Sequence, residues 1–257
     1  MKTRRSTPPI ARALGALVVA LACVAFGIQT AIGATAEQLG KTKDAPNPNC
    51  PERTPPPGQQ QTAEDLCQVT GQVTGFQKSA DGEKGLFKVP EDGQIVAWSV
   101  DLADPTKAER RTFGEASETN QYGKAPTAGI SIIRRKEGSV YKLMSSSPLL
   151  NVRGFYGEMP VFTLAQPLSV SSGDVVALTT ATWLPAFSNR NQTEDDAWVA
   201  SRKKEDCKVP KSVPPEDRIE YFFAHTAPHR KAGSERPYEC RYDKARILYW
   251  AYFVPDN

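Results

Sequence analysis

The segment Val161–Trp183 (VFTLAQPLSVSSGDVVALTTATW) constrains the fold of this chain more than any other stretch. It contains two apolar runs, Val161–Leu168 and Val175–Ala181, separated by the sequence SSGD at 171–174. The second run is rich in β-branched residues and flanked by turn formers, which predicts a strand rather than a helix. Its apolar side chains fall on both faces, as in a strand covered on both sides. The short link predicts a turn with Gly173 free to adopt positive φ.

A second clear strand signal lies at Gln94–Leu102 (QIVAWSVDL). The alternation predicts that Val96, Trp98, Val100 and Leu102 share one buried face. Similar short runs with strand character occur at Gln68–Gln77, Thr127–Arg135, Val140–Ser145 and Ala245–Val254.

The spacing of these runs predicts the fold class. Lys136-Glu137-Gly138-Ser139 lies between two of them and has the composition of a hairpin turn. Links of this length are too short for crossover helices, and no sustained helical period is present. We therefore expect an all-β fold, an antiparallel β-sandwich with jelly-roll-like architecture. One long segment, Pro185–Tyr238, interrupts this rhythm before the last strand. It is either a functional excursion or a disulfide-tied cap on the sandwich.

The N-terminus predicts export. Residues 1–36 combine four basic residues near the start with an uncharged stretch from Ala13 to Ala36. The apolar run Leu14–Phe26 and the small residues Ala34-Thr35-Ala36 are typical of a cleavable signal peptide. The same uncharged stretch is long enough to be an uncleaved membrane anchor, and both interpretations stay open.

Residues 37–66 are rich in Pro, Gln, Lys and Asn and have no apolar periodicity, which predicts a linker before a β-sandwich domain at 67–257. The whole chain has 32 basic and 29 acidic residues. Without the four basic residues of the leader, the remainder has a net charge of −1. A nearly neutral domain binds nucleic acid poorly, so we expect no nucleic-acid partner.

Four cysteines follow the leader: Cys50, Cys67, Cys207 and Cys240. An even number in an exported chain predicts two disulfides. Proximity favours Cys50–Cys67 and Cys207–Cys240, and a Cys67–Cys240 bond is the competing arrangement. A zinc site is disfavoured because no C-x-x-C pair is present.

The sequence offers little catalytic chemistry. His225 and His229 have a spacing seen in metal sites, but Pro228 between them disfavours a helix, so exposed loop histidines are expected instead. There is no G-x-S-x-G elbow, phosphate loop or dinucleotide motif. We predict no catalytic residue, metal ligand or cofactor. The acidic residues Glu194-Asp195-Asp196 and Glu216-Asp217 are the alternative candidates for a hydrolase.

Aromatic residues are frequent around the excursion. We consider Trp183, Trp198, Tyr238 and Tyr242 candidate ligand-binding residues, because sugar-binding sandwiches stack glycans on exposed rings. Packing of the same rings in the core is the alternative.

The pattern GQIVAWSVDL, then GSVYKLMSSSP, then SSGDVVALTTATWLPAF resembles secreted β-sandwich proteins of actinobacteria of unassigned function. The resemblance covers Gln68–Phe187 and the final strand. It implies a jelly-roll-like fold and a location in the cell envelope, and it carries over no catalytic residue. The function expected is an exported, non-catalytic binding or structural module, with a cell-wall or extracellular glycan as partner. Contact with the membrane is expected only through an uncleaved N-terminal segment. The alternative is an extracellular hydrolase that uses carboxylates or a histidine of the 185–240 excursion.

Overall fold

The computed structural model describes residues 35–50, 67, 69–113, 125–189, 192–214, 217, 221 and 224–256. All of them belong to one compact unit that extends from Ala34 to Asn257. The predicted leader lies outside the described residues except for its last two positions, and so does the second half of the predicted linker, residues 51–66. Within the described ranges, no helix has the length and apolar character needed to cross a membrane.

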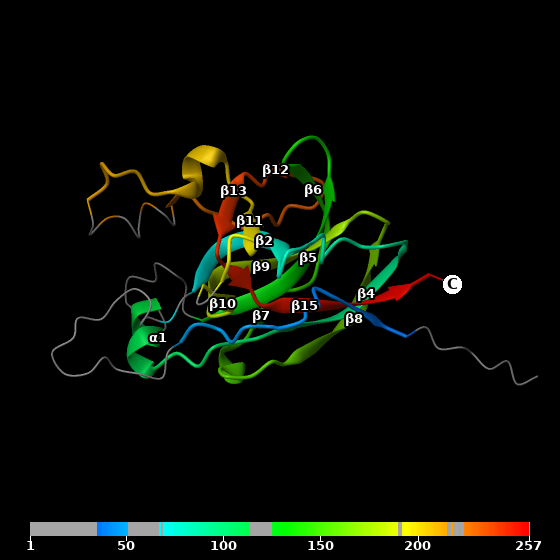
Figure 1. Ribbon diagram of the computed structural model, residues 1–257, viewed down its shortest axis with the longest axis horizontal. Coiled ribbons are helices and arrows are strands. Elements are labelled where there is room, and N and C mark those ends of the chain that lie inside the picture. The colour runs from blue at the N-terminus through cyan, green and yellow to red at the C-terminus, as the bar shows by residue number, and fades with distance from the viewer. Residues whose placement is uncertain are drawn as a thin grey trace, which may run out of the picture. The chain divides into compact units, whose positions relative to one another are not determined.

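Two main antiparallel sheets and a separate two-stranded sheet make up the fold (Figure 1). The smaller sheet has the order β1-β15-β4-β8. Its strands are β1 (Glu37–Leu39), β15 (Tyr249–Pro255), β4 (Gly93–Val100) and β8 (Val161–Val170).

The larger sheet curls and has the order β12-β6-β5-β9-β2-β11-β13. These strands are β12 (Glu235–Pro237), β6 (Val140–Ser146), β5 (Thr127–Arg135), β9 (Val175–Leu184), β2 (Thr70–Ala80), β11 (Ala197–Ala200) and β13 (Cys240–Asp243). Two short strands join its sides: β3 (Glu83–Lys84) pairs with β2, and β7 (Leu150–Asn151) pairs with β5. Separately, β10 (Phe187–Ser188) pairs with β14 (Arg246–Ile247). Three short helical segments complete the described elements: α1 (Lys107–Phe113), η2 (Arg153–Phe155) and η3 (Lys204–Cys207).

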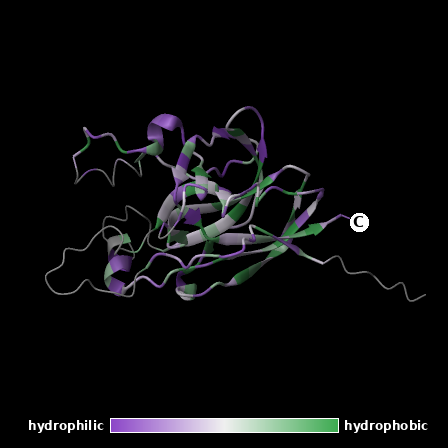
Figure 2. Ribbon diagram, viewed as in Figure 1, coloured by the Kyte–Doolittle hydropathy of each residue, from purple (hydrophilic) through white to green (hydrophobic). Residues whose placement is uncertain are grey.

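The main core lies between the two sheets. Ile95 and Trp98 of β4 are fully buried, and so are Ile130 of β5 and Val176 of β9. In Figure 2 the strands carry hydrophobic and hydrophilic segments, whereas η3 is mostly hydrophilic. The prediction of an all-β antiparallel sandwich is therefore confirmed.

The turn at 171–174 joins the two sheets, because β8 belongs to the small sheet and β9 to the large one. Gly173 has φ +87°, as expected. Asp174 fixes the turn: its side chain is 1% exposed, and it accepts hydrogen bonds from Ser171 N at 2.9 Å and from Arg134 Nε at 2.7 Å. The Asp174 hydrogen bond is the main reason that the pKa of Arg134 is raised.

Strand β4 differs from the predicted alternation at one position. Trp98, Val100 and Leu102 are buried as expected, but Val96 is half-buried and Ile95 is fully buried in its place. The register between β4 and β15 shifts at this point, so Val96 is the extra residue of a bulge. A bulge moves the following residues to the other face, and therefore Ile95 and Trp98 point to the same core.

The beginning of the predicted linker is part of the sandwich. Glu37–Leu39 forms β1 and pairs with β15, and Leu39 is buried in the core. Asn49 is also buried, at 2% exposure. Residues 37–39 and Asn49 are therefore part of the folded domain, held by partners that are far away in sequence.

The excursion after Leu184 also contains more structure than its composition suggests. Strand β11 is inserted between β2 and β13, inside the large sheet. The returning segment covers the second face of this sheet, where Tyr238 packs in a small cluster with Phe76 and Val199. The capping interpretation therefore describes this part of the excursion.

Both predicted disulfides are present, Cys50–Cys67 and Cys207–Cys240. The competing Cys67–Cys240 bond is excluded.

Candidate functional site

The four predicted aromatic ligand-binding residues do not form an exposed platform. Trp183, Trp198 and Tyr238 are only 0%, 5% and 3% exposed, and Tyr242 is half-buried. The ring of Trp198 stacks on that of Tyr242, with centroids 4.6 Å apart. The prediction that Trp183, Trp198 and Tyr238 bind a ligand is therefore wrong. These rings pack in the core, because the protein itself covers their faces.

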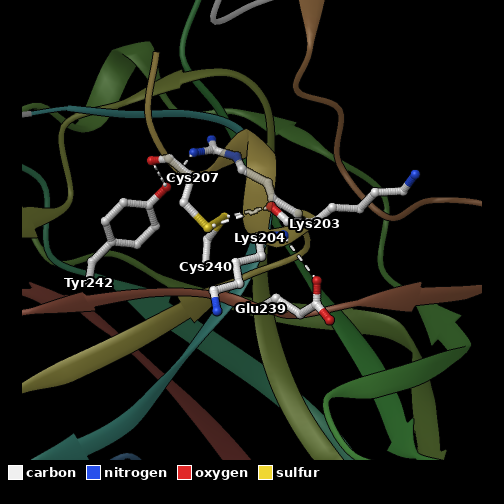
Figure 3. Close-up of a disulfide and its surroundings, with 7 residues drawn as sticks. Lys203, Lys204, Cys207, Glu239, Cys240 and Tyr242 are labelled. Atoms are coloured by element: carbon white, nitrogen blue, oxygen red, sulfur yellow. Dashed lines mark hydrogen bonds between the residues drawn. A yellow bond between two sulfur atoms is a disulfide. The ribbon is translucent and has the colours of Figure 1, made fainter. Parts of the chain in front are cut away.

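Tyr242 has a structural partner at the edge of the large sheet. Arg202, which is nearly buried, donates a hydrogen bond from Nη1 to the Tyr242 hydroxyl at 2.8 Å and another from Nη2 to the Gly71 carbonyl at 3.2 Å. Burial lowers the pKa of Arg202, and the contact with Tyr242 opposes that shift. The Cys207–Cys240 disulfide lies next to Tyr242 and beneath the η3 turn (Figure 3). This cluster ties the excursion to β13 and is structural.

The two histidines occupy different environments. His225 is exposed, and its ring stacks on Tyr221. His229 is fully buried, so the expectation of an exposed loop residue is wrong for it. Its Nε2 donates to the Ser234 carbonyl at 3.1 Å, which leaves Nδ1 to accept from the Tyr238 hydroxyl at 3.2 Å. Among the described residues no group of three or more His, Cys, Asp or Glu side chains is arranged to hold a metal ion.

Another candidate cavity, with both polar and apolar lining, lies elsewhere, around Arg246 in β14. Its volume is about 520 Å³. Four parts of the chain that are far apart in sequence build it. We call it the Arg246 cleft, and its lining consists of residues 44–49, Asp81, Arg246, and Ser188, Gln192, Thr193 and Asp196.

Two neighbouring strands place Arg246 at the floor of the cleft. It is paired with Ser188 of β10. On the side of β2, the buried Gln77 amide donates to the Ala245 carbonyl at 3.1 Å and accepts from Ile247 N at 2.9 Å. Because the residues on both sides of Arg246 are bound to one side chain, its backbone position is fixed.

The guanidinium of Arg246 is surrounded by protein acceptors. Its side chain is 6% exposed. Nη1 donates to the Asp44 carbonyl and to Asp81 Oδ1, both at 3.1 Å, and Nη2 donates to Thr42 Oγ1 at 2.6 Å. Asp196 Oδ1 lies 3.9 Å from Nη1. A buried guanidinium with this many hydrogen-bond partners is held in one position.

Both carboxylate oxygens of Asp196 accept hydrogen bonds from the protein backbone. Oδ1 accepts from Asp81 N at 3.1 Å, and Oδ2 accepts from Thr193 N at 2.9 Å. Its side chain is 5% exposed. The carboxylate therefore holds the Asp81 turn and the Thr193 turn together and supports the Arg246 charge.

Asn49 also lines the cleft. Its backbone N–H donates to the Phe187 carbonyl at 2.8 Å, its Oδ1 accepts from Ser188 Oγ at 3.1 Å, and its Nδ2 donates to Asn189 Oδ1. The adjacent Cys50 is bonded to Cys67. The disulfide thus fastens one end of segment 44–49, which lines the cleft.

The electrostatic character of the cleft limits its ligands. Three carboxylates, of Asp44, Asp81 and Asp196, line it together with one guanidinium, and two proline rings, Pro46 and Pro48, add apolar surface. An anionic ligand would meet a net negative charge here. The side chains of Asp44, Asn47 and Gln192 in the lining include both donors and acceptors, which suits hydroxyl groups.

A smaller groove of about 400 Å³ lies beside the Arg202 cluster, between residues 201–206 and 224–227. Basic and acidic side chains both line it, including Lys203, Asp206, Glu235 and Arg236. Its charges are mixed and its walls belong to the structural cluster, so it is the weaker candidate.

No protein-family model, curated protein or solved structure matches this chain.

None of the residues predicted as ligand-binding lines the Arg246 cleft, and Asp196 enters it from the alternative hydrolase set. One feature of the sequence indicates the Arg246 cleft. Arg246 stands inside the apolar run Ala245–Val254, and an arginine in an interior strand requires buried partners.

Proposed function

We propose that this chain is an exported, non-catalytic binding domain of the cell envelope, and that the Arg246 cleft binds a neutral, hydroxyl-rich ligand such as a sugar unit of a glycan. The observation that carries the ligand class is the set of amide and carboxylate side chains, Asn47, Gln192 and Asp44, that line the cleft around the fixed Arg246. Fixed polar groups lose little entropy when a ligand binds, and this favours selective recognition of hydroxyls.

Export is supported by the disulfides and by the leader. Two disulfides in one β domain indicate an oxidising environment outside the cytoplasm. The basic start, the apolar run Leu14–Phe26 and the small residues before Glu37 are typical of an export signal. The proposed location is the cell envelope, with membrane contact only if the leader is retained.

The carboxylates support binding over hydrolysis. A glycosidase needs one carboxylic acid that is free to protonate the leaving group and a second carboxylate facing the same bond. Asp196 is buried and uses both oxygens for protein hydrogen bonds, while Asp81 pairs with Arg246. Of the excursion's other described acids, Glu194 pairs with Lys244 at 2.7 Å. His229 is buried and bonded at both ring nitrogens.

The binding proposal can be tested by calorimetric titration of the purified chain with neutral and acidic cell-wall oligosaccharides. We expect a neutral sugar to bind, and Asn47→Ala and Gln192→Ala to weaken binding about tenfold, the effect of losing about 1.4 kcal/mol. Gln94→Ala, at an exposed amide on β4, is the matched control and should bind normally. Asp44→Asn separates ligand charges: it should leave a neutral ligand unaffected, weaken a cationic one and improve an anionic one. Unchanged affinity in both cleft variants would place the binding site elsewhere.

The export proposal has its own test. A C-terminally tagged chain should be recovered outside the cytoplasm with oxidised cysteines and, after cleavage, an N-terminus near Glu37. Recovery of a reduced chain in the cytoplasm would refute the proposed class.

A further inference from the structure

Positive charge is concentrated at one edge of the large sheet. Residues 134–142 and 229–237 carry seven basic and two acidic side chains, and the rest of the chain after the leader carries 21 basic and 27 acidic ones. The first segment contains the turn between β5 and β6, and the second contains β12, which Figure 1 shows beside β6. The net charge of −1 therefore hides a strong separation of charge, and a charged patch acts on the molecules that come near it.

Strand pairing places two arginines on one face of this edge. Arg135 of β5 lies opposite Tyr141 of β6, and Tyr141 lies opposite Arg236 of β12. Side chains that lie directly opposite each other share a face of the sheet. The Tyr141 ring contacts the rings of Phe76 and Tyr238. Both arginines therefore lie on the second face of the large sheet, where the small cluster is.

The positive charge extends beyond both ends of β12. At one end, Lys136 follows Arg135 in the hairpin turn. At the other end, the turn at 231–234 is held against β6 by a hydrogen bond of 2.8 Å from Gly233 N to the Leu143 carbonyl. The start of this turn adds two exposed basic side chains. We call the complete set the β12 basic surface, and it consists of Arg135, Lys136, Arg230, Lys231 and Arg236.

The carboxylates of the protein do not neutralise the β12 basic surface. In the part of the chain that the structure describes, none of its five side chains forms an ion pair. Arg135 and Arg236 donate to backbone carbonyls instead, those of Gly138 and Ala227, both at 2.8 Å. Several other basic residues do pair: Arg134 with Asp174, Arg241 with Asp243, Lys244 with Glu194 and Arg246 with Asp81. The β12 basic surface therefore attracts anions from outside the molecule.

The arrangement of these charges suits a long anion better than a small one. All of the five side chains except that of Arg236 are exposed, and one exposed charge pair contributes little by itself. The three residues of β12 separate the two ends of the surface by about 10 Å, which is more than one phosphate group can span. A linear polyanion contacts both ends at once, and linked contacts strengthen each other. It also releases its condensed counterions as the basic side chains neutralise it.

Three observations favour such a polymer over a lipid bilayer or a nucleic acid. Arg236 also lines the groove of about 400 Å³ described above, so the surface continues into a concave region that a chain can follow and a planar bilayer cannot. The two most exposed large hydrophobic residues, Met159 and Val161, lie at the start of β8 in the small sheet, away from the basic side chains that they would accompany in a membrane-binding surface. The rings of Tyr141 and Tyr238 contact each other, with centroids 5.0 Å apart, and do not form a platform for stacked bases.

We propose that the β12 basic surface binds a linear polyanion with a phosphate group in each repeating unit, at a site separate from the Arg246 cleft. Arginine binds phosphate through paired N–H donors, and lysine binds it as a point charge. The polymer lies along β12 from the hairpin turn to the turn at 231–234, and Arg236 contacts it between these two ends. The residues that line the Arg246 cleft take no part, so the two binding proposals can fail separately.

Fluorescence anisotropy of labelled linear polyphosphate, titrated with the purified chain in its oxidised form, tests this proposal. The triple variant Lys136→Gln/Arg230→Gln/Lys231→Gln removes three exposed charges and leaves the backbone contacts of β12 in place. Its affinity for polyphosphate should be about tenfold lower or less. The slope of log K against log salt concentration should also become shallower by about 2, because three phosphate contacts are lost.

The matched control is Lys41→Gln/Lys107→Gln/Arg111→Gln, which removes two lysines and one arginine from exposed positions outside the β12 basic surface. It has the same net charge as the first triple variant and should bind polyphosphate like the unaltered chain. Both triple variants should keep the circular dichroism spectrum and the melting temperature of the unaltered chain. An equal loss of affinity in the two would mean that only the net charge matters, and it would overturn the proposal.

Further ligands separate the classes of partner. Inorganic phosphate should bind at least tenfold more weakly than polyphosphate, and vesicles of phosphatidylglycerol and oligodeoxythymidylate of equal charge should also bind more weakly. Tighter binding to the vesicles or to the oligonucleotide would overturn the assignment of the polymer. Absence of polyphosphate binding at low salt would overturn the proposal as a whole.

Discussion

The Tyr249 hydroxyl donates a hydrogen bond of 2.8 Å to the carbonyl oxygen of Val176 and so connects the two sheets through the core. Tyr249 belongs to β15 of the small sheet and Val176 to β9 of the large one. The Tyr249 ring also stacks on Phe87, with centroids 4.1 Å apart. Burial raises the pKa of Tyr249 well above its ordinary value, since its phenolate would be charged inside the core.

Removing this hydroxyl tests the connection between the sheets. We expect Tyr249→Phe to lower the free energy of unfolding by about 1 kcal/mol, with a larger loss if the Val176 carbonyl stays unpaired. Tyr252→Phe is the control, because that half-buried side chain lies on the opposite face of β15. Urea denaturation of both variants measures the difference. Equal stability of the two would show that the inter-sheet hydrogen bond contributes nothing.

Much of the fold was predictable because its strands carry local patterns. The hairpin at 136–139, the turn at 171–174 and the doubly covered strand β9 follow from turn residues and apolar periodicity. Strands β1 and β11 were missed because they are short and are held by partners far away in sequence. The Val96 bulge could not be predicted either, since a bulge is defined by the register with neighbouring strands.

The bulge makes a test of the β4 core possible. Trp98→Ala should destabilise the protein by about 3–5 kcal/mol, because a fully buried side chain is replaced by a cavity. Val96→Ala should cost much less, because Val96 is the half-buried bulge residue. Thermal unfolding compares the two. An unchanged melting temperature for Trp98→Ala would mean that the faces of β4 are assigned in reverse.

The candidate site was less predictable than the fold. Sequence reasoning followed the aromatic rings, but Trp183 and Trp198 are needed to fill the core. The Arg246 cleft combines residues that meet only through the pairing of β14 with β10 and its contacts with β2. Its one local signal is a charged residue inside an apolar strand.

Arg246 should therefore matter for stability as well as for binding. Arg246→Ala leaves the buried Asp196 carboxylate without its counter-charge, and breaking such a pair costs about 3–5 kcal/mol. Arg241→Ala removes a half-exposed ion pair with Asp243 and should cost less than about 1 kcal/mol. Urea denaturation at neutral pH checks both values. Similar losses in the two variants would contradict the structural role of Arg246.

His229 should make stability depend on pH. Burial, together with the positive charge of Arg236, lowers the pKa of His229 in the folded state. The unfolded chain then binds the proton more readily, so this contribution is present above about pH 6.5 and is lost as pH falls towards the lowered pKa. His229→Gln should remove that part of the pH dependence, whereas His225→Gln, at an exposed histidine, should keep it. The measurement is the free energy of unfolding at a series of pH values from 5 to 8; identical pH profiles in all three proteins would refute the prediction.

The Cys207–Cys240 disulfide should stabilise the 185–240 excursion more than any other single contact in it. The bond closes a loop with a sequence separation of 33 residues between η3 and β13. In the chain-entropy model such a loop stabilises the fold by about 3–4 kcal/mol, because the bond restricts the unfolded chain. The double variant Cys207→Ser/Cys240→Ser should lose about this much stability while keeping the sandwich, since β11 and β13 still pair.

Cys50→Ser/Cys67→Ser is the comparison, because it releases segment 44–49, which lines the Arg246 cleft, and should weaken ligand binding more than the first pair does. Thermal unfolding under oxidising and reducing conditions measures how much each disulfide stabilises the protein. Non-reducing peptide mapping of the unaltered chain determines the pairing. A linked peptide containing Cys67 and Cys240 would refute the pairing, and free thiols at Cys207 and Cys240 would refute the disulfide.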